Sequence, residues 1–480
     1  MEKCNNRLEK EHPICGAACS KNGGAVIRGY SEDEFGTKLG TMLSASRPIH
    51  SIEYLKGRDK ELETIKRSLY APGRHVFIYG DRGVGKSSLG QTAAVQYQSA
   101  SAAPVFVAGS PDDSFSTVIA NIVIQALRQP RTESVKSIRS ATFDLARVKM
   151  SAGTEISAVD IADRIKSIGD AVALLEEVAE KRPGNTAVVI DEFDAILDAG
   201  ERNKFAALLK QMGDRSVNIK FIFTGVGKSL DELLGAHQSS YRQLEQVELP
   251  RLGWDARREI VQAAADAFEM QLDNDVNWRI AMVSDGFPYY VHLVTEKILW
   301  GAFSADQDIT QIDSDLFLHG LGEAILSTVG ELKRPYEKAV VHHPEMEDLV
   351  WATADHEDLI RSVDGIYQSY QFVVGRRADG RQPLERSRFA AQLRKLKGHA
   401  YGAVLTQPEG RQGLYTYREK MLRGYVRMQA EANGVALNGE QPVRKQAMHV
   451  GNARSGYRGP SIPRGVRTGK VVSEWDDSDS

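Results

Sequence analysis

The chain has 480 residues, of which 42% are hydrophobic and 26% are charged, and its formal net charge is −3. This length suggests about three domains, and the composition is that of an ordinary globular protein. The near-neutral charge excludes a strong overall attraction to nucleic acid, so any such contact must come from a local basic patch. No apolar run approaches the ~20 residues that span a bilayer, and the polar first residues lack a signal-peptide core. We therefore expect a cytoplasmic protein with no membrane partner.

The first 45 residues are poor in apolar side chains, and we expect residues 1–45 to form a flexible leader. All three cysteines of the chain lie in this segment, which excludes a disulfide framework for the core. One histidine accompanies them, so the leader holds a candidate set of four zinc ligands, Cys4, His12, Cys15 and Cys19. The segment is short and polar, and a leader without metal is the alternative.

A phosphate-binding loop follows. Residues 80–87 read Gly-Asp-Arg-Gly-Val-Gly-Lys-Ser and match G-x-x-x-x-G-K-[ST], with an apolar run before them and helical spacing from Ser88. This strand–loop–helix context makes the pattern specific. Glycines let backbone N–H groups surround a triphosphate, Lys86 can reach its β- and γ-phosphates, and the Ser87 hydroxyl can bind Mg²⁺. The predicted ATP-binding residues of this loop are Gly80, Asp81, Arg82, Gly83, Val84, Gly85, Lys86, Ser87 and Ser88.

A second motif lies at residues 187–192, where a short apolar run ends in Asp191 and Glu192. Functional groups often lie at the carboxyl end of a buried parallel strand. An aspartate there can hold Mg²⁺, and the glutamate after it can polarise the attacking water. We predict that Ser87 and Asp191 hold the metal, that Glu192 is the general base, and that Lys86 also acts in catalysis.

Apolar runs alternate with helical stretches over residues 46–252. This alternation predicts an α/β fold, with a parallel sheet flanked by helices on both faces. The helical spacing covers Phe115–Leu127, Asp160–Glu180 and Lys204–Met212. A poorly periodic insertion at 131–155 has room for a hairpin. From Trp254 the pattern is helical alone, which predicts a helical lid over 253–330.

Residues 331–430 mix helices with a hairpin, and their second half is basic: Arg376 to Lys397 holds eight Lys or Arg against two acids. Helices, a basic helix and then a hairpin is the order of a winged helix, so we predict a winged-helix-like domain. Its candidate DNA-binding residues are Arg386, Arg388, Gln392, Lys395 and Arg411. Residues 431–480 lose apolar periodicity and are basic, then acidic; we expect a disordered tail there.

The two phosphate motifs lie in a chain that resembles the AAA+ P-loop ATPases, above all the branch with the origin-recognition, archaeal-type and STAND ATPases. The resemblance covers about residues 46–330. Its segments are Gly57–Leu62 before the phosphate loop, Phe221–Gly225, Ser240–Arg242 with Val247–Pro250, and Asp285–Tyr290.

The resemblance implies roles for single residues. Arg58 would line the adenine side of the site; the alternative is that it caps local acids. Thr224 would be a polar sensor that bonds the γ-phosphate or the attacking water, and the alternative is a strand-end threonine that faces solvent. Arg242 would be an arginine finger that reaches the nucleotide of a neighbouring copy in a homo-oligomer, or else a surface arginine.

The lid departs from the pattern of many AAA+ proteins. Where an arginine is common in the lid helix, this chain has Tyr289, Tyr290 and His292. A lid without this arginine favours a slow switch over a fast motor.

Three hypotheses for function remain open. The first is a Mg²⁺-dependent, ATP-hydrolysing switch whose nucleotide state controls binding to double-stranded DNA through the winged helix. The second is a STAND-like regulatory or defence ATPase whose winged helix binds a protein partner. The third is a nucleotide-dependent scaffold that hardly turns over.

Overall fold

The computed structural model describes residues 27–45, 52–99, 102–128, 144–145, 148–149, 158–182, 184–227, 242–341, 343–377, 380–408 and 411–438. All of them fall within one unit of the chain, residues 1–441. No helix in these ranges is both long enough and apolar enough to cross a membrane.

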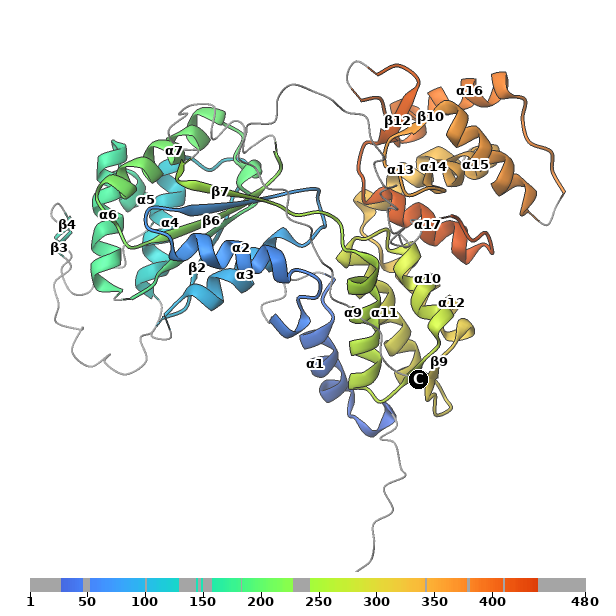
Figure 1. Cartoon of the computed structure of the whole chain (residues 1–480), viewed down its shortest axis with the longest axis horizontal. Helices are drawn as coiled ribbons and strands as arrows, with labels where there is room; N and C mark the ends of the chain where they lie inside the picture. The colour runs from blue at the N-terminus through green and yellow to red at the C-terminus, as the bar shows by residue number, and fades with distance from the viewer. Residues whose placement is uncertain are drawn as a thin grey trace, which may run out of the picture. The chain divides into compact units, whose positions relative to one another are not determined.

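A five-stranded parallel sheet forms the centre of the first half of the chain (Figure 1). Its strands lie in the order β2-β5-β6-β1-β7, and every neighbouring pair is parallel. Since β6 lies between β1 and β5, the carboxyl ends of these three strands meet at one edge. The strand bounds are β1 His75–Tyr79, β2 Val105–Ala108, β5 Ala187–Asp191, β6 Lys220–Gly225 and β7 Leu244–Glu248.

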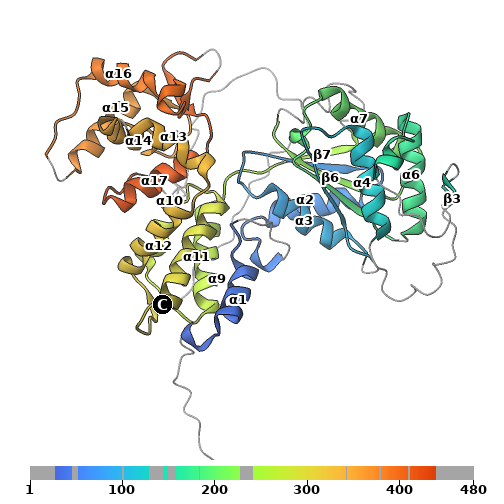
Figure 2. The same ribbon diagram turned by 180° about the vertical axis from the view of Figure 1, so that it is seen from behind.

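Helices cover both faces of this sheet. Val76 and Ile78 of β1 belong to one core with α2 (Asp59–Tyr70) and α3 (Lys86–Tyr97). Phe77 belongs to the opposite core, whose helices are α4 (Phe115–Arg128), α6 (Ile168–Lys181) and α7 (Ala199–Asp214). Figures 1 and 2 show the two helix layers on opposite sides of the sheet. Because both faces are buried, the three central strands β1, β5 and β6 contain continuous apolar runs in the sequence. The predicted α/β fold is confirmed.

The predicted helix at 160–180 is two helices, α5 (Ala158–Ala162) and α6. A capping box separates them: the Asp170 N–H bonds the Ser167 hydroxyl, and the Asp170 carboxylate accepts from the Ser167 N–H. This reciprocal pair favours a new helix start at Ile168. The insertion at 131–155 holds one described antiparallel pair, β3 (Asp144–Leu145) with β4 (Val148–Lys149), as its hairpin prediction expects.

Four helices form the lid region, together with one short parallel strand pair, β8 (Gln271–Leu272) and β9 (Gln311–Ile312). The pair is only two residues long on each side, too short for sequence periodicity to reveal. The helices are α9 (Trp254–Ala267), α10 (Asn274–Val283), α11 (Pro288–Ser304) and α12 (Ser314–Ser327).

The prediction of a flexible leader over 1–45 is wrong for its last part. Residues Glu32–Met42 form α1, which a Ser31 capping box starts. Phe35 of α1 is fully buried, stacked on Phe303 at 4.4 Å between ring centroids. Leu39 and Met42 of α1 are buried as well, so the helix presents one apolar face at helical spacing, which the sequence analysis overlooked. Residues 1–26, with the cysteine–histidine set, lie outside the described part of the chain.

The last described region contains a three-stranded antiparallel sheet of order β10-β12-β11. The expected disordered tail starts too early, because Val435 and Leu437 are buried in the core. The elements are α13 (Gly330–Val340), α14 (Glu347–Ala354), β10 (Arg361–Ser362), α15 (Val363–Gly375), α16 (Arg386–Lys395), β11 (Leu405–Thr406), β12 (Leu414–Tyr417) and α17 (Leu422–Ala432).

A buried ion cluster joins the lid to α17. Asp285, in the turn between α10 and α11, is 1% exposed and accepts two hydrogen bonds of 2.7 Å from Arg423. Arg427 and Arg251 are also within 3.2 Å and 2.9 Å of its carboxylate. Burial alone raises the pKa of Asp285, but the guanidinium groups outweigh that effect and bring the pKa down to about 2. The carboxylate is therefore an anion throughout the neutral range.

We predict that Asp285→Asn lowers the free energy of unfolding by about 3–5 kcal/mol near neutral pH, because it leaves buried arginines without their counter-ion. The folded pKa lies below the ordinary value, so this stability is fully present above about pH 4 and is lost as the pH falls toward 2. Urea denaturation of both proteins across this range measures it. The exposed pair Arg386–Asp364 provides the control, since Asp364→Asn should change little. Equal stability of wild type and Asp285→Asn near neutral pH would refute a stabilising cluster.

Candidate nucleotide-binding site

The phosphate loop connects β1 to α3, as the sequence predicts. Gly83 and Gly85 have φ angles of 77° and 94°, a left-handed conformation that glycine adopts without strain. Gly85 is the residue just before α3, so the free N–H groups of that helix start inside the loop. A side chain at Gly83 is also excluded by packing, because its Cβ would lie 2.3 Å from the Met421 sulfur. The loop thus offers a backbone cradle for an anion.

Lys86 lies at the centre of this cradle. Its Nζ donates to the carbonyl oxygens of Gly80 at 3.2 Å and Asp81 at 2.8 Å. Burial lowers the pKa of Lys86, and nearby carboxylates, Asp194 and Asp191 first among them, oppose that shift. The ammonium group is therefore held between the loop and the acids that follow β5, where a bound phosphate would meet it.

The carboxylate of Asp191, at the end of β5, accepts hydrogen bonds from three other residues of the site. Its Oδ1 accepts a 2.9 Å hydrogen bond from the Ser87 hydroxyl and a short one from the Thr224 hydroxyl. The N–H of Glu192 donates to the same oxygen at 3.1 Å. A hydroxyl and a carboxylate are hard oxygen ligands of the kind that Mg²⁺ prefers. The residues present therefore fit the predicted metal.

Thr224 is 1% exposed and bonded to Asp191, so the alternative of a threonine facing solvent is wrong. Its position at the end of β6, between β1 and β5, places its hydroxyl inside the site. Its sensor role remains a prediction.

The backbone of Glu192 is held in a left-handed conformation with φ of 50°. The neighbouring strand end passes directly against it: the Gly109 N–H donates to the Asp191 carbonyl at 2.8 Å. A Cβ at Gly109 would lie 2.6 Å from the Glu192 carbonyl oxygen. This close contact fixes the backbone of Glu192, the predicted base. The side chain of Glu192 is exposed and lines the same cleft as Lys86.

Arg58 stabilises the phosphate loop through its buried side chain. It is 3% exposed and donates to the carbonyl oxygens of Val84 at 3.0 Å and Pro250 at 2.7 Å. Burial lowers the pKa of Arg58, and its distance to the carboxylate of Glu61 is 3.8 Å. Arg58 also lines the cleft described in the next paragraph. Its side chain connects the phosphate loop to the segment after β7, in addition to its pairing with Glu61.

A cleft of about 770 Å³ opens beside the phosphate loop, which is large enough for a nucleotide. Sequence reasoning missed several of its walls, because they come from segments far apart in the chain and no local motif marks them. Among these residues are Tyr54 and Ile260 near one end, and Glu419 and Met421 from the last described region.

The structure also places the lid residues and Arg242 that the sequence analysis named. Tyr289 and His292 line the cleft, whereas Tyr290 is buried and donates from its hydroxyl to the Met421 carbonyl at 2.9 Å. Arg242 is exposed just before β7. Its finger role, which requires a second copy of the chain, stays a prediction.

The predicted DNA-binding residues do not all present free side chains. Arg386 pairs with Asp364 at 2.5 Å, and Gln392 is partly buried, with an Oε1 that has no hydrogen-bond partner. Exposed side chains of this region are Arg388, Lys395 and Arg411, together with Arg394, which the sequence analysis missed. Phe389 and Leu393 face the core, and helical spacing from those two residues would have placed Arg394 on the outer side.

The loop, its lysine and the Ser87–Asp191 pair define a P-loop nucleotide-binding site. Residues 54–222 match the family model described as an AAA ATPase domain. The chain therefore contains an AAA+ ATPase domain and is an ATPase, which confirms the prediction. A search of curated proteins found no match.

Several solved structures are similar to this chain over most of its length. The Walker-type ATPase paby2304 of Pyrococcus abyssi is 15% identical, with a TM-score of 0.45 over 80% of this chain and 99% of that chain. Cdc6p of Pyrobaculum aerophilum is 15% identical, with a TM-score of 0.40 over 82% and 97%. The ORC1 protein of Aeropyrum pernix in complex with DNA is 13% identical, with a TM-score of 0.38 over 79% and 94%.

We predict that Glu192→Gln lowers the ATP hydrolysis rate by about 10²–10⁴-fold, because the amide cannot take a proton from water. ATP affinity should stay within about threefold, since Lys86 and the loop provide the binding contacts. Steady-state hydrolysis and equilibrium binding of labelled ATP measure the two effects. An unchanged rate would show that Glu192 is not the base and would favour the scaffold hypothesis.

Proposed function

We propose that this protein is a Mg²⁺-dependent ATP-hydrolysing switch whose nucleotide state controls the binding of double-stranded DNA. Ser87 and Asp191 would hold the metal, which supplies charge neutralisation for the β- and γ-phosphates. Lys86 would hold the phosphates and Glu192 would polarise the attacking water. Thr224, bonded to both Asp191 and the Glu192 N–H, would keep the carboxylate and the base in register.

The observation that carries this proposal is a direct contact between the phosphate loop and the C-terminal region. Lys420, in the turn between β12 and α17, pairs with Asp81 of the loop at 2.6 Å. The next residue, Met421, packs against Gly83 closely enough to exclude any side chain there. A change in the loop on ATP binding or hydrolysis would therefore displace this turn. The helix α17 follows directly after this turn, and the Asp285 cluster connects α17 to the lid.

The order of elements supports a winged helix as the DNA-binding part. A helix (α14), a strand (β10), two helices (α15 and α16) and a hairpin (β11 and β12) follow one another, and β10 pairs with the second hairpin strand, β12. In such a motif the second of the paired helices enters the major groove. In this chain that helix is α16, whose exposed basic residues are Arg388, Arg394 and Lys395. Arg411 lies in the connection between the hairpin strands.

A protein partner is the second candidate. The same basic face of α16 could meet an acidic protein surface, as in a STAND-like regulatory or defence ATPase. The acids at the front of the region do not compete for it, because Glu347 and Asp348 already pair with Arg377. Salt-titrated DNA binding separates the two candidates.

We predict that duplex DNA affinity falls steeply as salt rises from about 0.05 to 0.2 M, because phosphate contacts release counter-ions. Arg388→Ala should weaken binding several-fold and reduce the slope of log affinity against log salt by about 1. Fluorescence anisotropy with a labelled duplex measures both. Arg67→Ala is the control, since Arg67 is an exposed arginine on α2, outside the predicted DNA-binding region, and its loss should not change binding. Weak, salt-independent binding unaffected by Arg388→Ala would favour the protein partner.

We predict that saturating ATP changes DNA affinity at least fivefold in the wild type, and that Lys420→Glu removes most of this change by repelling Asp81. The reversed pair Lys420→Glu with Asp81→Lys should restore it, because the opposite charges meet again. Anisotropy with and without ATP, on all three proteins, measures the coupling. If ATP shifts DNA affinity equally in wild type and Lys420→Glu, this contact does not transmit the nucleotide state.

A further inference from the structure

His292 is a buried polar side chain whose Nδ1 atom makes no hydrogen bond within the described residues. It lies on α11, is 3% exposed, and lines the nucleotide cleft together with Pro288 and Tyr289. Buried polar atoms are usually paired in folded proteins, and among the unpaired buried atoms of the described residues the Nδ1 of His292 belongs to a side chain that lines the nucleotide cleft.

The other fully buried histidine of the described sequence gives a direct contrast. His75 is 2% exposed, and its Nδ1 accepts a 3.0 Å hydrogen bond from the Phe221 N–H. His75 therefore links β1 to β6 as a structural residue. His292 has the same burial but no such bond, so burial in the core does not account for it.

The position of His292 along α11 indicates which part of a nucleotide it would meet. The start of α11 borders the phosphate loop, since Pro288 Cγ lies 3.8 Å from the position of a Cβ at Gly85. His292 is four residues further on, about 6 Å away along the helix axis. It therefore lines the cleft about one helical turn beyond the contact of Pro288 with the phosphate loop, and we infer that it would meet the nucleoside and not the phosphates.

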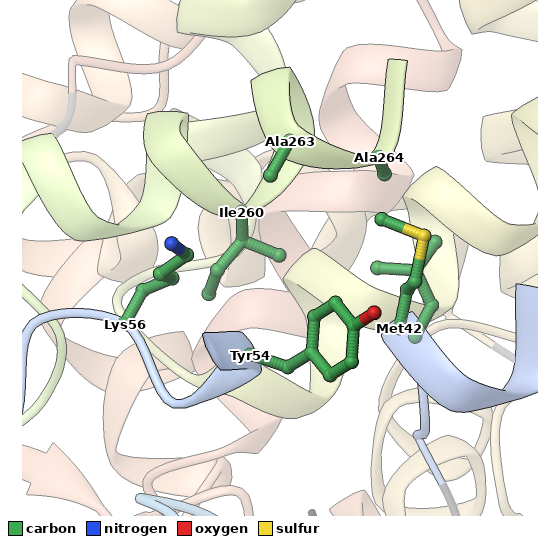
Figure 3. Close-up of a pocket in the computed structure, with 7 residues that line it drawn as sticks. Met42, Tyr54, Lys56, Ile260, Ala263 and Ala264 are labelled. Carbon is green, nitrogen blue, oxygen red and sulfur yellow. The ribbon is translucent and has the colours of Figure 1, made fainter. Parts of the chain in front are cut away.

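Apolar side chains form part of the cleft wall, next to Lys56. Ile260 of α9 lines the cleft and also a small adjoining cavity of about 10 Å³, which Tyr54 and Lys56 share with it (Figure 3). That cavity holds no more than a water-sized group, so a base would rest on these side chains and not inside it. The cleft thus combines charged groups such as Lys86 with apolar side chains such as Ile260.

The chemistry of His292 suits a contact with the nucleoside. Burial lowers the pKa of His292 to about 4, so its imidazole is neutral near pH 7. A neutral ring carries no charge to attract phosphate, unlike the arginine common in other AAA+ lids. It does offer one hydrogen-bond donor and one acceptor, which match a ribose hydroxyl or the polar edge of a base.

We propose that His292 forms a hydrogen bond to the nucleoside part of bound ATP and makes the lid recognise the nucleoside instead of the phosphates. This proposal rests on the proposed ATP site. It assigns His292 as a specificity residue of that site, one that recognises the bound molecule without contacting the reacting phosphate.

The test compares ATP with tripolyphosphate, which has the phosphates alone. His292→Leu keeps a similar volume and removes the polar atoms; we expect its ATP dissociation constant to rise about tenfold, because the nucleoside loses a buried partner. Its affinity for tripolyphosphate should stay within about twofold. His292→Gln keeps a donor and an acceptor and should bind ATP within about threefold of the wild type. Calorimetry measures these constants, and circular dichroism melting checks that each variant is folded.

Analogues identify the nucleoside group involved. If the bond goes to the ribose, 2′-deoxy-ATP or 3′-deoxy-ATP should bind the wild type about as weakly as ATP binds His292→Leu. If the bond goes to the base, inosine triphosphate should bind the wild type about as weakly as ATP binds His292→Leu. In His292→Leu these differences should vanish, as expected for a double-mutant cycle.

Two outcomes overturn the proposal. Equal ATP affinity of folded His292→Leu and wild type would show that His292 makes no contact with the nucleotide. A parallel loss of ATP and tripolyphosphate affinity would show that the change disturbs the phosphate cradle. Failure of the site itself has another signature: the wild type would then bind neither compound, and Lys86→Ala would be indistinguishable from it.

Discussion

One carboxylate oxygen organises the site. Asp191 Oδ1 receives hydrogen bonds from Ser87 at the start of α3, from Thr224 at the end of β6 and from the Glu192 N–H. These groups come from three separate parts of the chain, and only the strand order β5-β6-β1 brings them to one edge. A polar cluster of this kind is stable because each member is bonded to another. In the proposed site, Ser87 and Asp191 would hold the metal and Lys86 would hold the phosphates.

The rest of the described chain is arranged around that edge. The lid contributes α11, whose first residue abuts the phosphate loop, and the C-terminal region contributes the Lys420–Met421 turn. The buried carboxylate of Asp285 holds these two parts together through Arg423. The phosphate loop, the lid and α17 are therefore joined by direct contacts. These contacts are the physical basis for proposing a switch.

Much of this could be predicted from the sequence. The phosphate loop and the Asp191–Glu192 pair are local patterns that chemistry requires at fixed spacing, and the continuous apolar runs followed from strands buried on both faces. Thr224 and Arg58 needed a family resemblance, since one threonine or arginine has no local signature. The family model confirms the ATPase domain itself.

The remainder depends on contacts between distant residues. The helix α1 was missed although its buried residues Phe35, Leu39 and Met42 follow helical spacing. The strand β7 was missed because only two of its residues are buried. The pairing of Arg386 with Asp364 reduced the predicted basic face, a loss that only the folded arrangement of α15 and α16 reveals. The contact of Met421 with Gly83 joins residues more than three hundred positions apart, so no spacing rule could have found it.

The most direct test of the account is calorimetric titration of ATP into the full chain, with and without Mg²⁺, for the wild type and Asp191→Asn. The account predicts one ATP per chain, with an affinity that Mg²⁺ increases in the wild type and leaves nearly unchanged in Asp191→Asn. Absence of ATP binding in the presence of Mg²⁺ would contradict it, and so would an equal effect of Mg²⁺ on both proteins.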